Sequence, residues 1–125
     1  MKPIFMVRLS KREEQIMKVF WDLGKAFIRD IIPRLPEPQP HYNSVATIVK
    51  ILEEKGFLNH EPVGNIYEYF PLICREDYQK HAMRDIVSHY FDNSYPRMLA
   101  FFAKEQNLSE EELNEILNVI KSKKQ

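Results

Sequence analysis

The sequence has little cysteine, little glycine and no long apolar run, and each of these absences excludes a class of protein. Its single cysteine, Cys74, can form neither an internal disulfide nor a cysteine-cluster zinc site within one chain. Its three glycines form no glycine-rich phosphate loop and no nucleophile elbow. No apolar run approaches the roughly 20 residues that span a bilayer. Nucleotide-binding loops, hydrolase elbows and membrane spans are therefore not expected.

The chain also lacks an excess of charge of either sign. Its 18 Lys and Arg residues balance 18 Asp and Glu residues. A neutral chain has no overall field that attracts a polyanion, so any contact with nucleic acid must come from the local placement of side chains. The charged start, "MKPIFMVRLSKREE", is unlike a secretory signal, which predicts a cytoplasmic protein with no membrane insertion.

What the sequence does contain is a succession of short amphipathic segments. Ser10 and Glu13 have the spacing of a capping box, which predicts a helix over residues 11–23. A second helical segment follows around residues 28–35, and Pro33 limits its length. The prolines of "PEPQP" then require an extended connection.

The stretch "HYNSVATIVKILEEKGF" predicts a third helix, because Val45, Ile48, Val49 and Leu52 recur at the helical period. After it, two alternating segments flank Gly64-Asn65, a pattern typical of a β-hairpin. Three short helices followed by a hairpin indicate a winged helix-turn-helix domain over residues 1–73.

The face of the third helix opposite its apolar stripe carries side chains suited to DNA. In a helix-turn-helix the second helix lies in the major groove, where Asn pairs with adenine, Thr and Ala contact thymine methyls, and Lys reaches guanine or phosphate. The candidate DNA-binding residues are Lys11, Tyr42, Asn43, Ser44, Ala46, Thr47, Lys50, Asn65 and Tyr67. Alternatives remain open: a merely solvated face, or a winged helix that binds protein instead of DNA.

Residues 74–125 are predicted to be a three-helix region. These helices carry more apolar surface than an isolated monomer can cover, and pairing with a second copy would bury it. The candidate dimerisation residues are Tyr78, Ile86, Tyr90, Phe91, Met98, Leu99, Phe102, Leu113, Ile116, Leu117 and Ile120. The predicted fold is thus mostly α with an α+β wing, divided into a DNA-binding domain and a dimerisation domain.

A metal-dependent enzyme is the remaining alternative. His81, Asp85 and His89 fall on one helix face, but two turns separate the histidines, and a solvated face is favoured. We therefore predict no catalytic residue, no metal site and no cofactor.

Four segments in order resemble the penicillinase-repressor family of bacterial winged-helix regulators, the BlaI/MecI family: "LSKREEQIMKVFW", "YNSVATIVKILEEKGFL", "GNIYEYFPLI" and "FFAKEQNLSEEELNEIL". The resemblance implies a homodimer that binds a palindromic operator in double-stranded DNA and represses transcription. In this family the repressed genes are commonly those of β-lactam resistance, and the C-terminal helices form the dimer.

The resemblance also implies a route of release. In the best-known members, a membrane-bound sensor metalloprotease triggers cleavage of an Asn-Phe bond. That bond aligns with Phe101-Phe102, where this chain has Phe in place of Asn. Two reading-helix positions that carry Arg in those members are Ala46 and Ile51 here. The groove-reading role therefore carries over, whereas the operator sequence does not.

Overall fold

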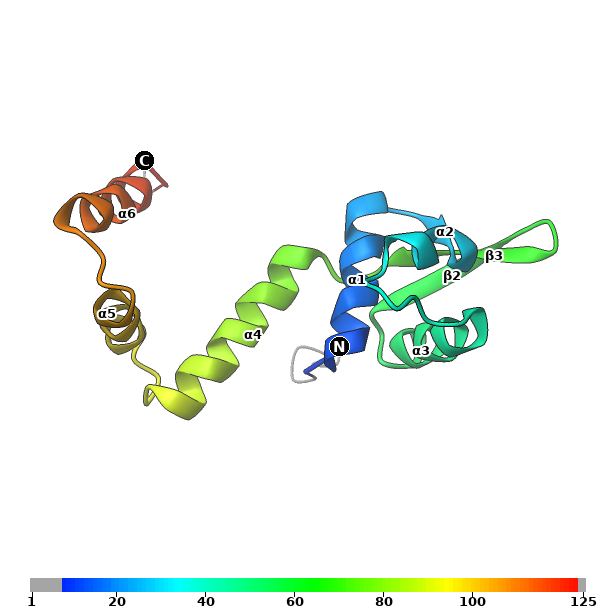
Figure 1. Ribbon diagram of the computed structural model, residues 1–125, viewed down its shortest axis with the longest axis horizontal. Helices are drawn as coiled ribbons and strands as arrows, with labels where there is room; N and C mark the ends of the chain where they lie inside the picture. The colour runs from blue at the N-terminus through cyan, green and yellow to red at the C-terminus, as the bar shows by residue number, and fades with distance from the viewer. Residues whose placement is uncertain (1–7, 124–125) are drawn as a thin grey trace. The chain divides into compact units, whose positions relative to one another are not determined.

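The computed structural model describes residues 8–123 (Figure 1). These residues fall into two compact units, which divide between Ala82 and Met83. The predicted division after residue 73 falls just before helix α4 (Arg75–Tyr90), whereas the units divide inside this helix. The physical reason is that Tyr78 and Ala82, in the first half of α4, pack on the core of the first unit.

Helix α1 (Lys11–Leu23) begins and ends as predicted. The Glu13 amide donates to the Ser10 hydroxyl at 3.2 Å, and the Ser10 amide donates to the Glu13 carboxylate at 2.7 Å. These bonds satisfy amides that the first turn of a helix leaves unpaired. Gly24 ends the helix with φ of +86°, and its amide donates to the Phe20 carbonyl at 2.7 Å.

The helix-turn-helix follows a short strand. In chain order its elements are β1 (Ala26–Phe27), α2 (Ile28–Ile31), the 3-10 helix η2 (Ile32–Arg34) and α3 (Tyr42–Glu54). Pro33 lies in the first turn of η2, where its missing amide costs little. Helix α3 lies within the stretch from His41 to Phe57 that predicted it.

The wing is the antiparallel pair β2 (Leu58–Val63) and β3 (Ile66–Pro71), which projects beyond the helices of its unit in Figure 1. Val63 lies opposite Ile66, so only Gly64 and Asn65 form the turn, and Gly64 has the positive φ of +63° that such a turn requires. The structure adds a strand that the sequence did not predict, because β1 pairs with β3 and gives the sheet order β1-β3-β2.

A single core holds the first unit together. Its fully buried side chains come from α1, α2, α3 and the start of the wing, and the largest are Phe20, Phe57, Ile16, Met17, Ile31, Leu52, Leu58, Val45 and Val49. The apolar stripe predicted on the third helix therefore lies in this core, together with the buried residues of α1.

The second unit contains the rest of α4, then α5 (Tyr95–Glu105) and α6 (Glu110–Lys123). Ser109 and Glu112 form a second capping box, with bonds of 2.9 and 3.1 Å. Phe91 packs against Phe101 and Phe102 of α5, with ring centroids 5.5 and 6.3 Å apart. The predicted fold class, mostly helical with a small β wing, is confirmed.

Candidate nucleic-acid interface

Helix α3 presents a polar face because its opposite face is fixed in the core. Val45, Val49 and Leu52 have no exposed surface. The side chains on the other face, by contrast, are exposed: Tyr42, Asn43, Ser44, Thr47 and Lys50. Five of the predicted DNA-binding residues are therefore together on one accessible surface.

Two side chains of α3 differ in detail from the sequence-based picture. The Thr47 hydroxyl donates to the Asn43 carbonyl at 2.9 Å, so its hydrogen is used within the helix while the side chain remains exposed. A methyl contact with thymine is then the natural way for Thr47 to reach a base. Ala46 is only half-exposed and packs against the core, so it presents less surface than predicted.

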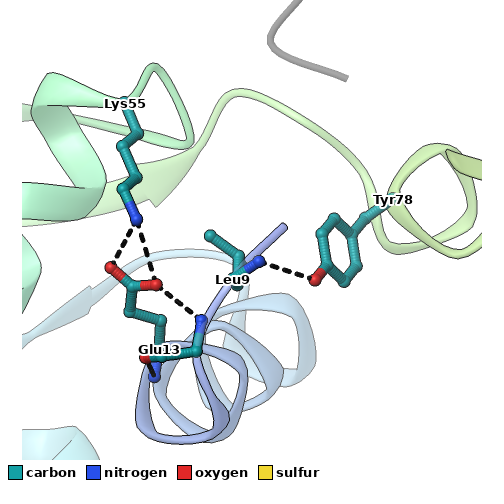
Figure 2. Close-up of polar contacts among 5 residues, drawn as sticks. Leu9, Glu13, Lys55 and Tyr78 are labelled. Carbon is teal, nitrogen blue, oxygen red and sulfur yellow. Dashed lines mark hydrogen bonds and ion pairs between the residues drawn. The ribbon is translucent and has the colours of Figure 1, made fainter. Parts of the chain in front are cut away.

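A buried ion pair fixes the C-terminal end of α3 to α1 (Figure 2). The Lys55 ammonium donates to both carboxylate oxygens of Glu13, at 2.9 and 3.1 Å. Glu13 is 7% exposed. Burial alone would raise the pKa of Glu13, but the hydrogen bonds from Lys55 and Ser10 and the charge of Lys55 outweigh it, so this pKa is lowered. The charged pair therefore holds the exposed face of α3 in a fixed orientation.

The wing is joined to α3 by a second polar contact. His60 of β2 has its Nδ1 atom 2.5 Å from a carboxylate oxygen of Glu53. The His60 ring lies 4.2 Å from the Tyr67 ring and 5.4 Å from the Tyr69 ring, centroid to centroid. Tyr67, although it contacts the His60 ring, is exposed, and so is Asn65 at the hairpin turn. The His60–Glu53 contact thus connects the wing to α3, the helix that carries the reading face.

Between the wing and the start of α3 lies a hollow of about 390 Å³. We call it the wing hollow; its lining residues are Phe27, Ile28, Arg29, Tyr42, Asn65, Ile66, Tyr67 and Tyr69. It brings together three predicted residues, Tyr42, Asn65 and Tyr67. It also contains Arg29, which the sequence analysis missed because nothing local marks a single arginine in a one-turn helix. Lys11, on the first turn of α1, is not among the lining residues.

Tyr78 is a correction to the predicted dimer surface. It is 6% exposed, and its ring packs against Trp21 and Phe57. Its hydroxyl accepts a hydrogen bond from the Leu9 amide at 3.1 Å (Figure 2) and donates to a Glu14 carboxylate oxygen at 2.6 Å. Burial, together with Glu14, raises the pKa of the Tyr78 hydroxyl. Tyr78 therefore belongs to the core of the first unit.

The other predicted dimerisation residues lie in the second unit and fall into two groups. Met98 is buried within the chain, and Ile86 and Phe91 are half-buried, so these three are largely covered by their own protomer. Met98 in particular is not available as predicted. The exposed group is Tyr90, Leu99, Phe102, Leu113, Ile116, Leu117 and Ile120.

Across residues 8–123, no three His, Cys, Asp or Glu side chains are grouped so that they could hold a metal ion. The His89 Nδ1 atom instead lies 2.9 Å from the Asp85 carbonyl oxygen of its own helix. Within the same residues, no helix is both long and apolar enough to cross a bilayer.

The helix-turn-helix, its exposed reading face and the attached hairpin define a winged-helix protein. The sequence matches the penicillinase repressor family over residues 9–122, so the chain belongs to that family, which consists of transcriptional repressors and not of enzymes. The resemblance noted in the sequence is thus confirmed.

Individual relatives are similar along most of their length but at low identity. The penicillinase repressor of Bacillus licheniformis is 25% identical over 118 residues, which cover 94% of this chain and 92% of the relative. The methicillin resistance regulatory protein MecI of Staphylococcus aureus strain N315 is 20% identical over 117 residues, with 92% and 94% covered. A 16.5 kDa protein of Latilactobacillus sakei is 22% identical over 116 residues, with 92% and 80% covered.

Proposed function

We propose that this repressor acts in the cytoplasm as a homodimer that binds a palindromic operator, with the exposed face of α3 in the major groove. The observation that carries the proposal is the polar face of Asn43, Thr47 and Lys50, which is exposed on a helix whose other side is fully buried. A reading helix must be held rigidly for its side chains to discriminate bases. The Lys55–Glu13 pair supplies such a constraint.

Dimerisation is assigned to the second unit. Leu117 of α6 is 49% exposed, and Leu99 of α5 is 51% exposed, among several apolar neighbours on both helices. Burying such residues against a second copy would stabilise the pair by the hydrophobic effect. Linking two reading helices makes the second half-site contact intramolecular, so the dimer binds far more tightly than a single domain.

Release from the operator is proposed to follow loss of the dimer, through proteolysis or another signal. The family resemblance points to the Phe101–Phe102 bond and to a membrane-bound sensor metalloprotease. This bond lies inside α5, and both rings pack against Phe91. A protease binds its substrate in an extended form, so cleavage here requires α5 to unwind locally. Cleavage would then separate α6 and the end of α5 from the rest of the chain, and with them much of the apolar surface proposed to hold the dimer.

The test is a footprint of the purified protein on the DNA upstream of its own coding sequence, at defined salt. A protected inverted repeat with half-sites about one helical turn apart, or a multiple of it, is the expected result. Salt-sensitive binding with no protected site would instead favour a winged helix that binds protein. The composition of the wing supports the protein-binding alternative, because residues 58–71 contain neither Lys nor Arg to contact phosphates.

Substitution of Asn43 by Ala tests the reading face directly. A lost base contact should weaken specific binding by roughly 1–3 kcal/mol for each half-site, with little effect on nonspecific binding. Gln79→Ala, an exposed polar residue on α4, is the matched control and should bind as the unaltered protein does. Equal operator affinity for both variants would contradict the assignment of the reading face.

A further inference from the structure

The wing hollow combines a cation with several hydrogen-bond donors. Its lining includes Arg29 of α2, Tyr42, which is the first residue of α3, and Asn65 and Tyr67 of the hairpin. Side chains from three segments of the chain therefore converge on a space of about 390 Å³. Guanidinium, amide and phenol groups are donors that bind anionic oxygens well.

The phenol groups of the hollow lie close together. The pKa of the Tyr69 hydroxyl is raised by burial and also by the nearby Glu53, Tyr42 and Tyr67. Glu53 is itself in contact with His60. Three tyrosines, Tyr42, Tyr67 and Tyr69, are thus among the residues that line the hollow.

Arg29 is only weakly engaged within the protein. Its side chain is 68% exposed, and its Nε atom is 3.9 Å from the adjacent Asp30 carboxylate, which is itself 52% exposed. Its guanidinium lies 5.2 Å from the centroid of the Phe27 ring, which leaves the planar edge free for a ligand. The wing has no Lys or Arg of its own. Among the residues that line the hollow, Arg29 is the single Lys or Arg.

We propose that the wing hollow receives one backbone phosphate of each operator half-site, with Arg29 as the cation and Tyr42, Asn65 and Tyr67 as further donors. This inference rests on the proposed function and adds a phosphate site to it. A helix in the major groove is flanked by sugar-phosphate backbone, and contacts to it fix the register of the helix. The hollow begins at Tyr42, the first residue of α3, where such a phosphate would lie.

The first test is the salt dependence of operator binding by Arg29→Ala. Each neutralised phosphate contributes about 0.9 to the slope of log affinity against log salt, so two arginines in a dimer should lower the slope by about 1.8. Between about 1 M and 0.15 M salt, this difference in slope lowers the operator affinity of Arg29→Ala about 30-fold relative to the unaltered protein. The difference in affinity should become smaller as the salt concentration rises. Arg29→Lys should keep the slope.

Arg34→Ala is the matched control, because Arg34 is an exposed arginine of the neighbouring η2 that does not line the hollow. It should change the slope much less. Equal changes in both variants would mean that only overall charge matters, and would overturn the proposal. So would an unchanged slope for Arg29→Ala on an operator that is bound specifically.

The second test replaces single phosphates of the operator by uncharged methylphosphonates, one position at a time. At one position in each half-site, the methylphosphonate should lower the affinity of the unaltered protein. The affinity of Arg29→Ala should be the same for this modified operator and for the unmodified one. Additive losses at every position would refute the assigned phosphate. If the unaltered protein protects no operator, the proposed function fails, and this inference fails with it. If the operator is protected but the Arg29 tests fail, only this inference is refuted.

Discussion

Replacing Lys55 by Met would test how much the buried ion pair contributes to the winged-helix unit. The substitution keeps an unbranched side chain, one atom shorter, and removes the cation that donates to Glu13 at 2.9 and 3.1 Å. Breaking a buried pair and leaving one charge behind costs about 3–5 kcal/mol. Because the Lys55 side chain is 32% exposed, water can reach part of the vacated space. We therefore expect a loss of about 2–3 kcal/mol in the free energy of unfolding.

The pH dependence of that loss gives a sharper check than its size. Since the folded pKa of Glu13 is lowered below 4.5, its charged form stabilises the fold above about that pH. This stabilisation disappears as the pH falls through the folded pKa. The difference between Lys55→Met and the unaltered protein should therefore be largest near neutral pH and should shrink in acid.

The assay is urea unfolding followed by circular dichroism, at a fixed protomer concentration because dimerisation would shift the apparent stability. Lys18→Met, on the exposed side of α1, is the control and should stay within about 0.5 kcal/mol of the unaltered protein. Adding Glu13→Gln to Lys55→Met should recover part of the loss, since no buried charge then remains. A loss for Lys55→Met that is the same at neutral and acid pH would refute the electrostatic reasoning.

Two further predictions concern packing. Leu52→Ala should lower the free energy of unfolding by about 2–5 kcal/mol, because Leu52 is fully buried. Ile51→Ala, at the exposed neighbouring position, should lower it by about 0.5 kcal/mol or less. Urea titrations that give equal losses for the two variants would contradict the assigned faces of α3. Ile116→Asp, at an exposed apolar position of α6, should shift sedimentation from dimer to monomer while the helical signal is kept. A dimer that persists in this variant would place the interface elsewhere.

Features that depend on neighbours along the chain could be predicted from the sequence. The capping boxes at Ser10 and Ser109 mark where α1 and α6 begin, because the paired residues are three positions apart. The turn at Gly64 is equally local. The elements of the winged helix therefore follow from local spacing.

Features that depend on distant pairing could not be predicted. The two-residue strand β1 exists only because Ala26 and Phe27 pair with β3. Tyr78 is apolar enough to be predicted in an interface, but the sequence does not say which surface covers it, and it packs in the core of its own unit. Arg29 likewise joins the wing hollow only through the fold. The sequence thus predicts faces better than it predicts their partners.

The sparse charge of the reading helix has a consequence for how a chromosome is searched. Lys50 is the sole Lys or Arg between Tyr42 and Glu54, in a chain with no net charge. Affinity for random DNA arises almost wholly from neutralised phosphates, so a protein with few such contacts dissociates readily from random sites. Because a genome offers about a million or more competing sites, weak nonspecific binding leaves more of the protein free to find its target. A modest number of molecules per cell can then keep an operator occupied.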